Sequence, residues 1–335
     1  MTEQVEVKKA KELHKQDVLS KPNVVGVGTG YRTVGKKTTD ELCVVALVRR
    51  KIPKAGLADQ DMVPSSLDGV KTDVIEVGDI RPQQTPTDRW RPAPGGVSLG
   101  HYQITAGTFG CVVRDQGTGD RLILSNNHVI ANSNDASIGD PVLQPGPADG
   151  GQTADDTIAH LERFCPIVFS EEPGTCNIAD AFASVGNFLA GLTGSKHHVE
   201  IVRRDLQAVN LVDAAVARPI DDSQILDEIL EIGTLTDITL PILGMSVRKS
   251  GRTTGLTTGT INVIDTTVDV SYGIGRTARF ENQIVSTAMS QGGDSGSCLV
   301  DGDSELAVGL LFAGSDQATI FNPIEAVFDC LDVML

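Results

Sequence analysis

A glycine-rich turn that runs directly into an apolar strand constrains the fold of this chain more than any other feature. The stretch reads Ser290-Gln-Gly-Gly-Asp-Ser-Gly-Ser-Cys-Leu-Val300 and carries Ser295 between Asp294 and Gly296. A serine hydroxyl becomes a nucleophile when a base takes its proton, and the intermediate then needs N–H groups aimed at its oxyanion. Because glycines adopt backbone angles that other residues resist, the N–H groups of Gly293 and Ser295 could converge on one point. The same residues also suit a simple hairpin turn, so the choice depends on partners elsewhere in the chain.

A base and an orienting carboxylate both lie upstream of Ser295. The stretch Arg121-Leu-Ile-Leu-Ser-Asn-Asn-His-Val-Ile130 predicts an apolar strand that runs into His128. Asp213 lies inside an otherwise apolar run, and an unpaired buried carboxylate is costly, so a hydrogen bond to the imidazole would account for it. Asp180 has a similar setting and is the alternative.

The order of these residues distinguishes between serine-hydrolase folds. His…Asp…Ser is the order of the chymotrypsin-type double β-barrel, whereas α/β-hydrolases and subtilisins use other orders. Over roughly residues 105 to 330 the chain resembles the trypsin-like (chymotrypsin-fold) serine peptidases. Within this family it resembles more closely a group of intracellular bacterial and plant members, which have an N-terminal extension. The motifs that carry the resemblance are Thr105–Val113, Leu124–Val129, Val212–Val216 and Gly292–Ser297, with Lys249–Gly259 and Arg91–Gly96 for the intracellular group.

The resemblance implies a mainly β fold and a role for each site residue. We expect a chymotrypsin-like double six-stranded β-barrel preceded by a small α+β module. In such a site Ser295 attacks the scissile carbonyl, His128 transfers the proton and Asp213 orients the histidine. The N–H groups of Gly293 and Ser295 form the oxyanion hole.

The resemblance also places a pocket for the residue before the scissile bond. Its floor is the position six before the nucleophile, here Met289, where a trypsin-type pocket has Asp. Its wall is the apolar strand that contains Leu311, Phe312 and Ala313. We therefore expect cleavage after small or medium apolar residues, with the peptide added as a strand along this edge. Many members of this family are activated when a freed N-terminus inserts beside the serine, but no Ile-Val-Gly-Gly-like sequence follows a cleavage site here. We therefore expect an enzyme that is constitutively competent or switched by another route, such as contacts within a homo-oligomer.

Turn residues and strand spacing divide the chain into segments. Residues 1–80 predict a small α+β module, a pro-segment, folding aid or docking domain, and the Pro/Gly-rich residues 81–97 predict a linker. Residues 98–335 are the expected peptidase domain. Within it, the first barrel covers about 105–220 with an insertion at about 174–206, and the second barrel covers about 245–324.

Composition excludes several other functions. The formal net charge of −16 argues against a nucleic-acid partner, and no run approaches the length of a membrane span. The six cysteines form no Cys-x-x-Cys pair, and His197-His198 lacks further ligands at metal spacing, so we expect no metal and no cofactor. Cys165 and Cys176 could pair, but without an export signal we expect all six to be thiols and the compartment to be cytoplasmic.

The function that follows is a serine endopeptidase that acts on protein or peptide substrates. Two alternatives use the same residues. One is a catalytically idle module that binds peptides on the same barrels, and the other is an esterase acting on small acyl esters through the same triad.

Overall fold

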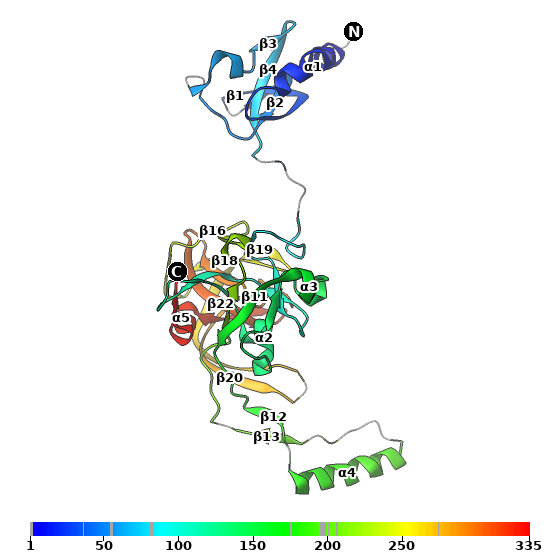
Figure 1. Cartoon of the computed structure of the whole chain (residues 1–335), viewed down its shortest axis with the longest axis vertical. Helices are drawn as coiled ribbons and strands as arrows, with labels where there is room; N and C mark the ends of the chain where they lie inside the picture. The colour runs from blue at the N-terminus through cyan, green and yellow to red at the C-terminus, as the bar shows by residue number, and fades with distance from the viewer. Residues whose placement is uncertain are drawn as a thin grey trace. The chain divides into compact units, whose positions relative to one another are not determined.

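The computed structural model describes residues 3–35, 37–53, 56–78, 80, 84–174, 176–194, 199, 201–205, 207–273 and 275–335. The chain forms two compact units, Met1–Gln83 and Gln84–Leu335, both drawn in Figure 1. His197 and His198, which we expected to bind no metal, lie outside the described residues.

The first unit packs one helix on a four-stranded sheet of order β1-β2-β4-β3. β1 and β2 are antiparallel, while β2 and β4 run parallel. The helix buries Val7, Ala10 and Val18 against a cluster that includes Val44 and Ala46 of β2, which explains its amphipathic sequence. The elements are α1 (Glu3–Leu19), β1 (Val24–Val34), β2 (Lys37–Val48), the 3-10 helix η2 (Asp59–Asp61), β3 (Ser66–Leu67) and β4 (Val70–Glu76).

The first barrel is a ring in which β7 and β8 act as one bent strand. Hydrogen-bonded neighbours run β8-β9-β14-β11-β10-β6-β7. Between β7 and β8, the N–H of Phe109 donates to Val97 and that of Gly110 donates to Leu124, so this segment bridges the two ends of the path. The strands are β6 (Ser98–His101), β7 (Gly107–Thr108), β8 (Cys111–Asp115), β9 (Arg121–Ser125), β10 (Pro141–Leu143), β11 (Thr157–Phe164) and β14 (Ala215–Pro219).

The second barrel closes through β23, which pairs with both β20 and β22. The ring runs β20-β19-β18-β21-β22-β23 and returns to β20. The predicted double six-stranded β-barrel of chymotrypsin type is therefore confirmed as the fold of the second unit. The ring strands are β18 (Ser246–Gly251), β19 (Gly255–Ser271), β20 (Thr277–Thr287), β21 (Cys298–Asp301), β22 (Leu306–Gly314) and β23 (Ala318–Pro323).

Each barrel has its own apolar core, and a third cluster joins the two. Leu99, Phe109 and Ile123 are buried in the first barrel, and Ile261 and Phe321 in the second. The joining cluster contains side chains of α5 together with β8, β9, β21 and β22. This packing fixes the orientation of the two barrels relative to each other. Side chains from both barrels can therefore form one site.

Short elements outside the rings complete the second unit. They are β5 (Ala93–Gly95), β12 (Glu171–Pro173), β13 (Val202–Arg204), β15 (Ile225–Ile229), β16 (Gly233–Thr234), β17 (Asp237–Ile238), β24 (Val333–Met334), α2 (Asn127–Ile130), α3 (Thr153–Asp156), α4 (Asn177–Leu192), α5 (Ile324–Leu331), η3 (Asn132–Asn134), η4 (Pro147–Asp149) and η5 (Asp222–Gln224).

The segment that we expected to be a linker, 81–97, differs from that prediction over most of its length. From Gln84 the chain belongs to the second unit, and residues 81–83 lie outside the described part. Ala93 and Val97 are fully buried, and β5 pairs in parallel with β15. The prolines and glycines of this segment lie in an extended, packed stretch. Because β5 is paired with β15, this stretch is part of the second unit and is not a flexible linker.

The insertion between the barrel strands consists of β12, α4 and β13. β12 pairs with β13 and also with β20, at Glu171 and Thr277. One face of α4 exposes large apolar side chains: Ile178, Phe182, Val185, Phe188, Leu189 and Leu192.

The prediction that all six cysteines are thiols is wrong, because Cys165 and Cys330 form a disulfide. The alternative pairing of Cys165 with Cys176 is wrong as well, since Cys176 is free and exposed. The two cysteines meet because α5 packs against the first barrel, a contact that their sequence separation of 165 residues conceals. The disulfide counts against the thiol argument for a cytoplasmic compartment, which stays a prediction.

Replacing both Cys165 and Cys330 by Ala is expected to lower the free energy of unfolding by about 2–4 kcal/mol, since the cross-link restricts a long loop in the unfolded chain. Urea unfolding of the oxidised wild type and the double variant measures the difference. Cys176→Ser serves as the control, because that thiol is free and exposed. Alkylation of six cysteines in unreduced, unfolded protein would contradict the disulfide.

Candidate active site

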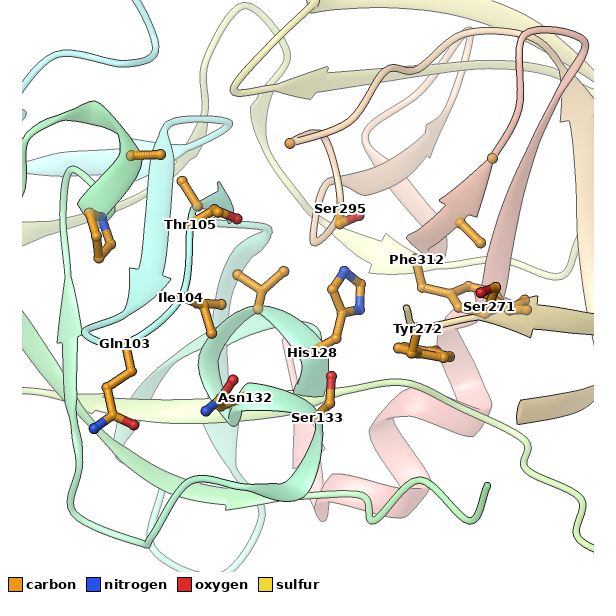
Figure 2. A pocket seen from close by; sticks show the side chains of 18 residues that line it. Gln103, Ile104, Thr105, His128, Asn132, Ser133, Ser271, Tyr272, Ser295 and Phe312 are labelled. Atoms are coloured by element: carbon orange, nitrogen blue, oxygen red, sulfur yellow. The ribbon is translucent and has the colours of Figure 1, made fainter. Parts of the chain in front are cut away.

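A cavity of about 910 Å³ lies between the two barrels and is lined by both of them. Its lining includes His128 from the first barrel and Ser295 from the second. Figure 2 shows the His128 imidazole directed toward the Ser295 side chain across this cavity. The Ser295 hydroxyl makes no hydrogen bond to another described residue, so it is free to contact a molecule bound in the cavity. Among the lining side chains none is an Asp, Glu, Lys or Arg.

His128 lies in α2, one turn beyond the end of β9, and is oriented by Asp213. The imidazole Nδ1 lies 2.6 Å from Asp213 Oδ2, and the His128 backbone N–H donates to Asp213 Oδ1 at 3.1 Å. The Asp213 side chain is fully buried, whereas that of His128 is 22% exposed. Asp213 therefore fixes both the backbone and the ring of the histidine, and leaves Nε2 for the cavity. Asp180, the alternative, is exposed on α4.

Two buried asparagines hold this pair in place, and sequence reasoning gave neither of them such a role. The side-chain amide of Asn126 donates to the Asp213 carbonyl at 2.7 Å, and the Asp213 N–H donates to Asn322 Oδ1 at 3.0 Å. Asn126 precedes the histidine by two residues, in the Asn-Asn-His motif. A polar pair at the end of an apolar strand was the only sequence signal for it, and Asn322 had none.

Tyr272 is a third residue that sequence reasoning missed. It follows β19, lines the cavity and donates its hydroxyl to Asp213 Oδ2 at 2.7 Å. Burial and the adjacent carboxylate raise the pKa of this hydroxyl well above its usual value, which keeps it a donor.

The loop that carries Ser295 is fixed by backbone hydrogen bonds to both barrels. The carbonyl of Ser295 accepts from the Thr108 N–H at 2.7 Å, and the Gly296 N–H donates to Leu311 at 2.8 Å. Gly293 has a φ of 98°, and a Cβ there would come within 2.6 Å of Arg252, so glycine is required. The N–H groups of Gly293 and Ser295 donate to no other described residue, which leaves both available for an oxyanion.

The neighbouring Asp294 is fully buried and pairs with the buried Lys249. The Lys249 ammonium lies 3.3 Å from Asp294 Oδ2, and neither side chain is exposed. The same carboxylate accepts the N–H groups of Gln291 and Thr253 at 2.9 and 2.8 Å. Burial opposes the ionisation of Asp294, but Lys249 and the hydrogen bonds outweigh it and lower its pKa. An internal lysine thus neutralises the carboxylate beside Ser295.

Arg252 connects the two barrels. Its guanidinium contacts the Asp149 carboxylate through two hydrogen bonds of 2.6 Å, and its backbone N–H donates to Thr108 at 3.0 Å. Since Asp149 and Thr108 belong to the first barrel and Arg252 to the second, these contacts tie the barrels together beside the cavity.

The four residues predicted to form the specificity pocket separate into two pairs. Phe312 and Ala313 line the cavity. Met289 and Leu311 do not line it, because their side chains pack in the core of the second barrel, where they are 5% and 2% exposed. Leu311 packs in the core, whereas the next residue, Phe312, lines the cavity, as expected for successive side chains of a strand, and a register shift between Leu311 and Ala313 lets Ala313 line it too.

The described part of the chain contains neither a cluster of metal ligands nor a helix that could span a membrane. No group of three or more His, Cys, Asp or Glu side chains there could hold a metal ion. None of the helices described is long and apolar enough to cross a membrane.

Comparison with known proteins gives no match to a family model and none to a curated protein. Solved structures do resemble the chain. Nocardiopsis protease (NAPase) is 17% identical, with 72% of this chain and 97% of that chain covered and a TM-score of 0.46. Thermobifida fusca protease A is 17% identical over 72% and 97% of the two chains, with a TM-score of 0.45. A glutamic-acid-specific serine protease is 18% identical over 72% and 100%, also with a TM-score of 0.45. The chain is thus similar in structure, at low sequence identity, to chymotrypsin-fold serine proteases.

Proposed function

We propose that this chain is a serine endopeptidase with Ser295 as nucleophile, His128 as general base and acid, and Asp213 as the orienting carboxylate. One observation carries the proposal. His128, which is hydrogen-bonded to the buried Asp213, and Ser295 line one cavity, although the three residues come from distant parts of the chain.

The chemistry follows from the positions of these groups. Ser295 Oγ attacks the scissile carbonyl while His128 Nε2 takes the hydroxyl proton, and Asp213 stabilises the resulting imidazolium. The unpaired N–H groups of Gly293 and Ser295 would hold the oxyanion. His128 then gives its proton to the leaving amine, which completes the acyl-enzyme, and water attacks the ester by the same steps in reverse order.

An open strand edge beside the cavity supports a peptide substrate over a small ester. β22 pairs with β21 only as far as Leu310, and the segment Phe312–Gly314 pairs with β23 alone. This segment lines the cavity, so an extended peptide can add to its free edge as a strand.

Cleavage after small or medium apolar residues remains the preferred specificity. The cavity offers the apolar side chains of Phe312 and Ala313 and contains no carboxylate to pair with Lys or Arg. Met289 brings no charge to this region and fills core space instead.

We expect the site to be competent without proteolytic activation or oligomer contacts. The Lys249–Asp294 pair already supplies an internal cation to the carboxylate beside Ser295. A freed N-terminal amine is not needed for that purpose.

A fluorophosphonate probe tests the proposal on the full chain. Wild type is expected to be labelled at Ser295, and Ser295→Ala is expected to remain unlabelled. Ser290→Ala is the matched control, because Ser290 lies in the same turn but hydrogen-bonds to Thr319. A folded wild type that is not labelled would overturn the proposal and favour the idle binding module.

Cleavage mapping on a peptide library separates peptidase from esterase and tests specificity. The peptidase proposal expects cuts that depend on Ser295 and that follow small or medium apolar residues. Hydrolysis of acyl esters without any peptide cleavage would support the esterase. Cuts that share no apolar residue before the scissile bond would contradict the specificity.

A further inference from the structure

We infer that Tyr272 is a positioning residue for the reaction: its hydroxyl holds the Asp213 carboxylate in the orientation that His128 requires. This inference rests on the proposed function, because it names a further residue of the same site. It concerns a residue that no sequence motif of the chain marks.

The contacts of the Asp213 carboxylate define the role. Oδ1 accepts the backbone N–H of His128, and Oδ2 accepts both His128 Nδ1 at 2.6 Å and the Tyr272 hydroxyl at 2.7 Å. The tyrosine is thus the one donor to the carboxylate, among the described residues, that does not belong to the histidine. Without it, rotation of the carboxylate would be limited by His128 alone.

The charge of Asp213 makes the hydrogen bond from Tyr272 stronger than one between two neutral groups. Asp213 is fully buried and forms no ion pair with a lysine or arginine of the described chain. A buried carboxylate must be compensated by hydrogen bonds, and bonds to a charged acceptor are stronger than neutral ones. The Tyr272 hydroxyl supplies such a bond even when His128 is neutral.

The tyrosine ring also contacts the histidine that the carboxylate orients. The rings of Tyr272 and His128 meet edge to face, with centroids 5.8 Å apart. On its other sides the Tyr272 ring packs against Phe169 and Phe280, at 5.7 and 6.2 Å. One residue therefore restrains Asp213 through its hydroxyl and His128 through its ring.

The turn that presents Tyr272 is fastened to the first barrel. The Tyr272 N–H donates to the Arg276 carbonyl at 2.9 Å. The Arg276 guanidinium pairs with Asp135, in the loop after α2, at 2.9 Å and lies over the Phe169 ring at 5.3 Å. These contacts fix the β19–β20 turn relative to the loop that follows His128, so the hydroxyl is held in place from two sides.

Tyr272→Phe tests the inference, because it removes the hydroxyl and keeps the ring that packs against Phe169 and Phe280. The expected result is a kcat about tenfold lower, the effect of losing one hydrogen bond to a charged group, with KM within about twofold of wild type. Tyr31→Phe is the matched control, since Tyr31 is exposed in the first unit. An unchanged kcat in Tyr272→Phe would overturn the inference, as would a loss confined to KM.

The proton NMR signal of the hydrogen bond between His128 Nδ1 and Asp213 Oδ2 provides a readout that does not depend on catalysis. Tyr272 donates to the same oxygen, so removing its hydroxyl leaves more negative charge on Oδ2 and strengthens the bond to His128. The signal of the Nδ1 proton is therefore expected to move to lower field in Tyr272→Phe and to stay in place in Tyr31→Phe.

The two measurements separate this inference from the proposed function. If wild type fails to hydrolyse peptides but the Nδ1 proton signal of His128 moves in Tyr272→Phe, the positioning role stands and the peptidase proposal fails. If wild type is active and neither kcat nor this signal changes, the positioning role is overturned and the peptidase proposal stands.

Discussion

Replacing Asp213 by Asn is expected to lower kcat about 10⁴-fold while leaving the barrels folded. In the wild type, Asp213 Oδ2 accepts the Nδ1 proton of His128 at 2.6 Å, so Nε2 is free to take the serine proton. An asparagine can turn its amide toward Nδ1 and favour the tautomer with a proton on Nε2, which cannot accept another. Initial rates on an apolar peptide substrate, with active-site titration of the enzyme, measure the change.

Asp180→Asn is the matched control for this experiment. Asp180 was the alternative orienting carboxylate, and the structure leaves it exposed on α4. We expect its replacement to leave kcat within about twofold of wild type, as for surface substitutions in general. A large loss in Asp180→Asn together with a small loss in Asp213→Asn would contradict the site.

Replacing Lys249 by Met is expected to have the largest effect on stability. Lys249 and Asp294 are both fully buried, so removing the ammonium leaves a buried carboxylate without its cation. Breaking such a pair by removing one partner costs about 3–5 kcal/mol. Since Asp294 lies between Gly293 and Ser295, reorganisation of this turn would also disturb the oxyanion N–H groups. We expect lower stability in urea and loss of fluorophosphonate labelling.

Two comparisons make the Lys249 prediction specific. Lys249→Met combined with Asp294→Asn removes both charges and is expected to recover part of the stability. Arg279→Gln breaks the exposed pair with Asp269 and is expected to change stability little. A single Lys249→Met variant as stable as wild type would contradict the buried pair.

Acid should weaken the same pair. The pKa of Asp294 in the folded protein lies below its ordinary value of 3.8. The stabilisation is therefore fully present above that pH and is lost as the pH falls through the lower, folded-state pKa.

The sequence by itself determined the fold class and the elements that lie close to the motifs. The order of His128, Asp213 and Ser295, with the family resemblance of the motifs around them, predicted two β-barrels, and the hydrogen-bonded rings confirm them. The segments outside the barrels, a small α+β module and an insertion, were predicted from turn residues and strand spacing, which are local properties of the chain. The turn that carries Ser295 could be predicted because its glycine, aspartate and serine residues are neighbours in sequence.

Only the tertiary structure decided which distant groups meet. It chose Asp213 over Asp180 as the partner of His128, joined Cys165 to Cys330 and paired Lys249 with Asp294. It also turned Met289 into the core and brought the Tyr272 hydroxyl to Asp213. Periodicity and motifs depend on residues that are neighbours along the chain. These contacts depend instead on strand register and on the packing of the barrels, which are set jointly by residues far apart in sequence.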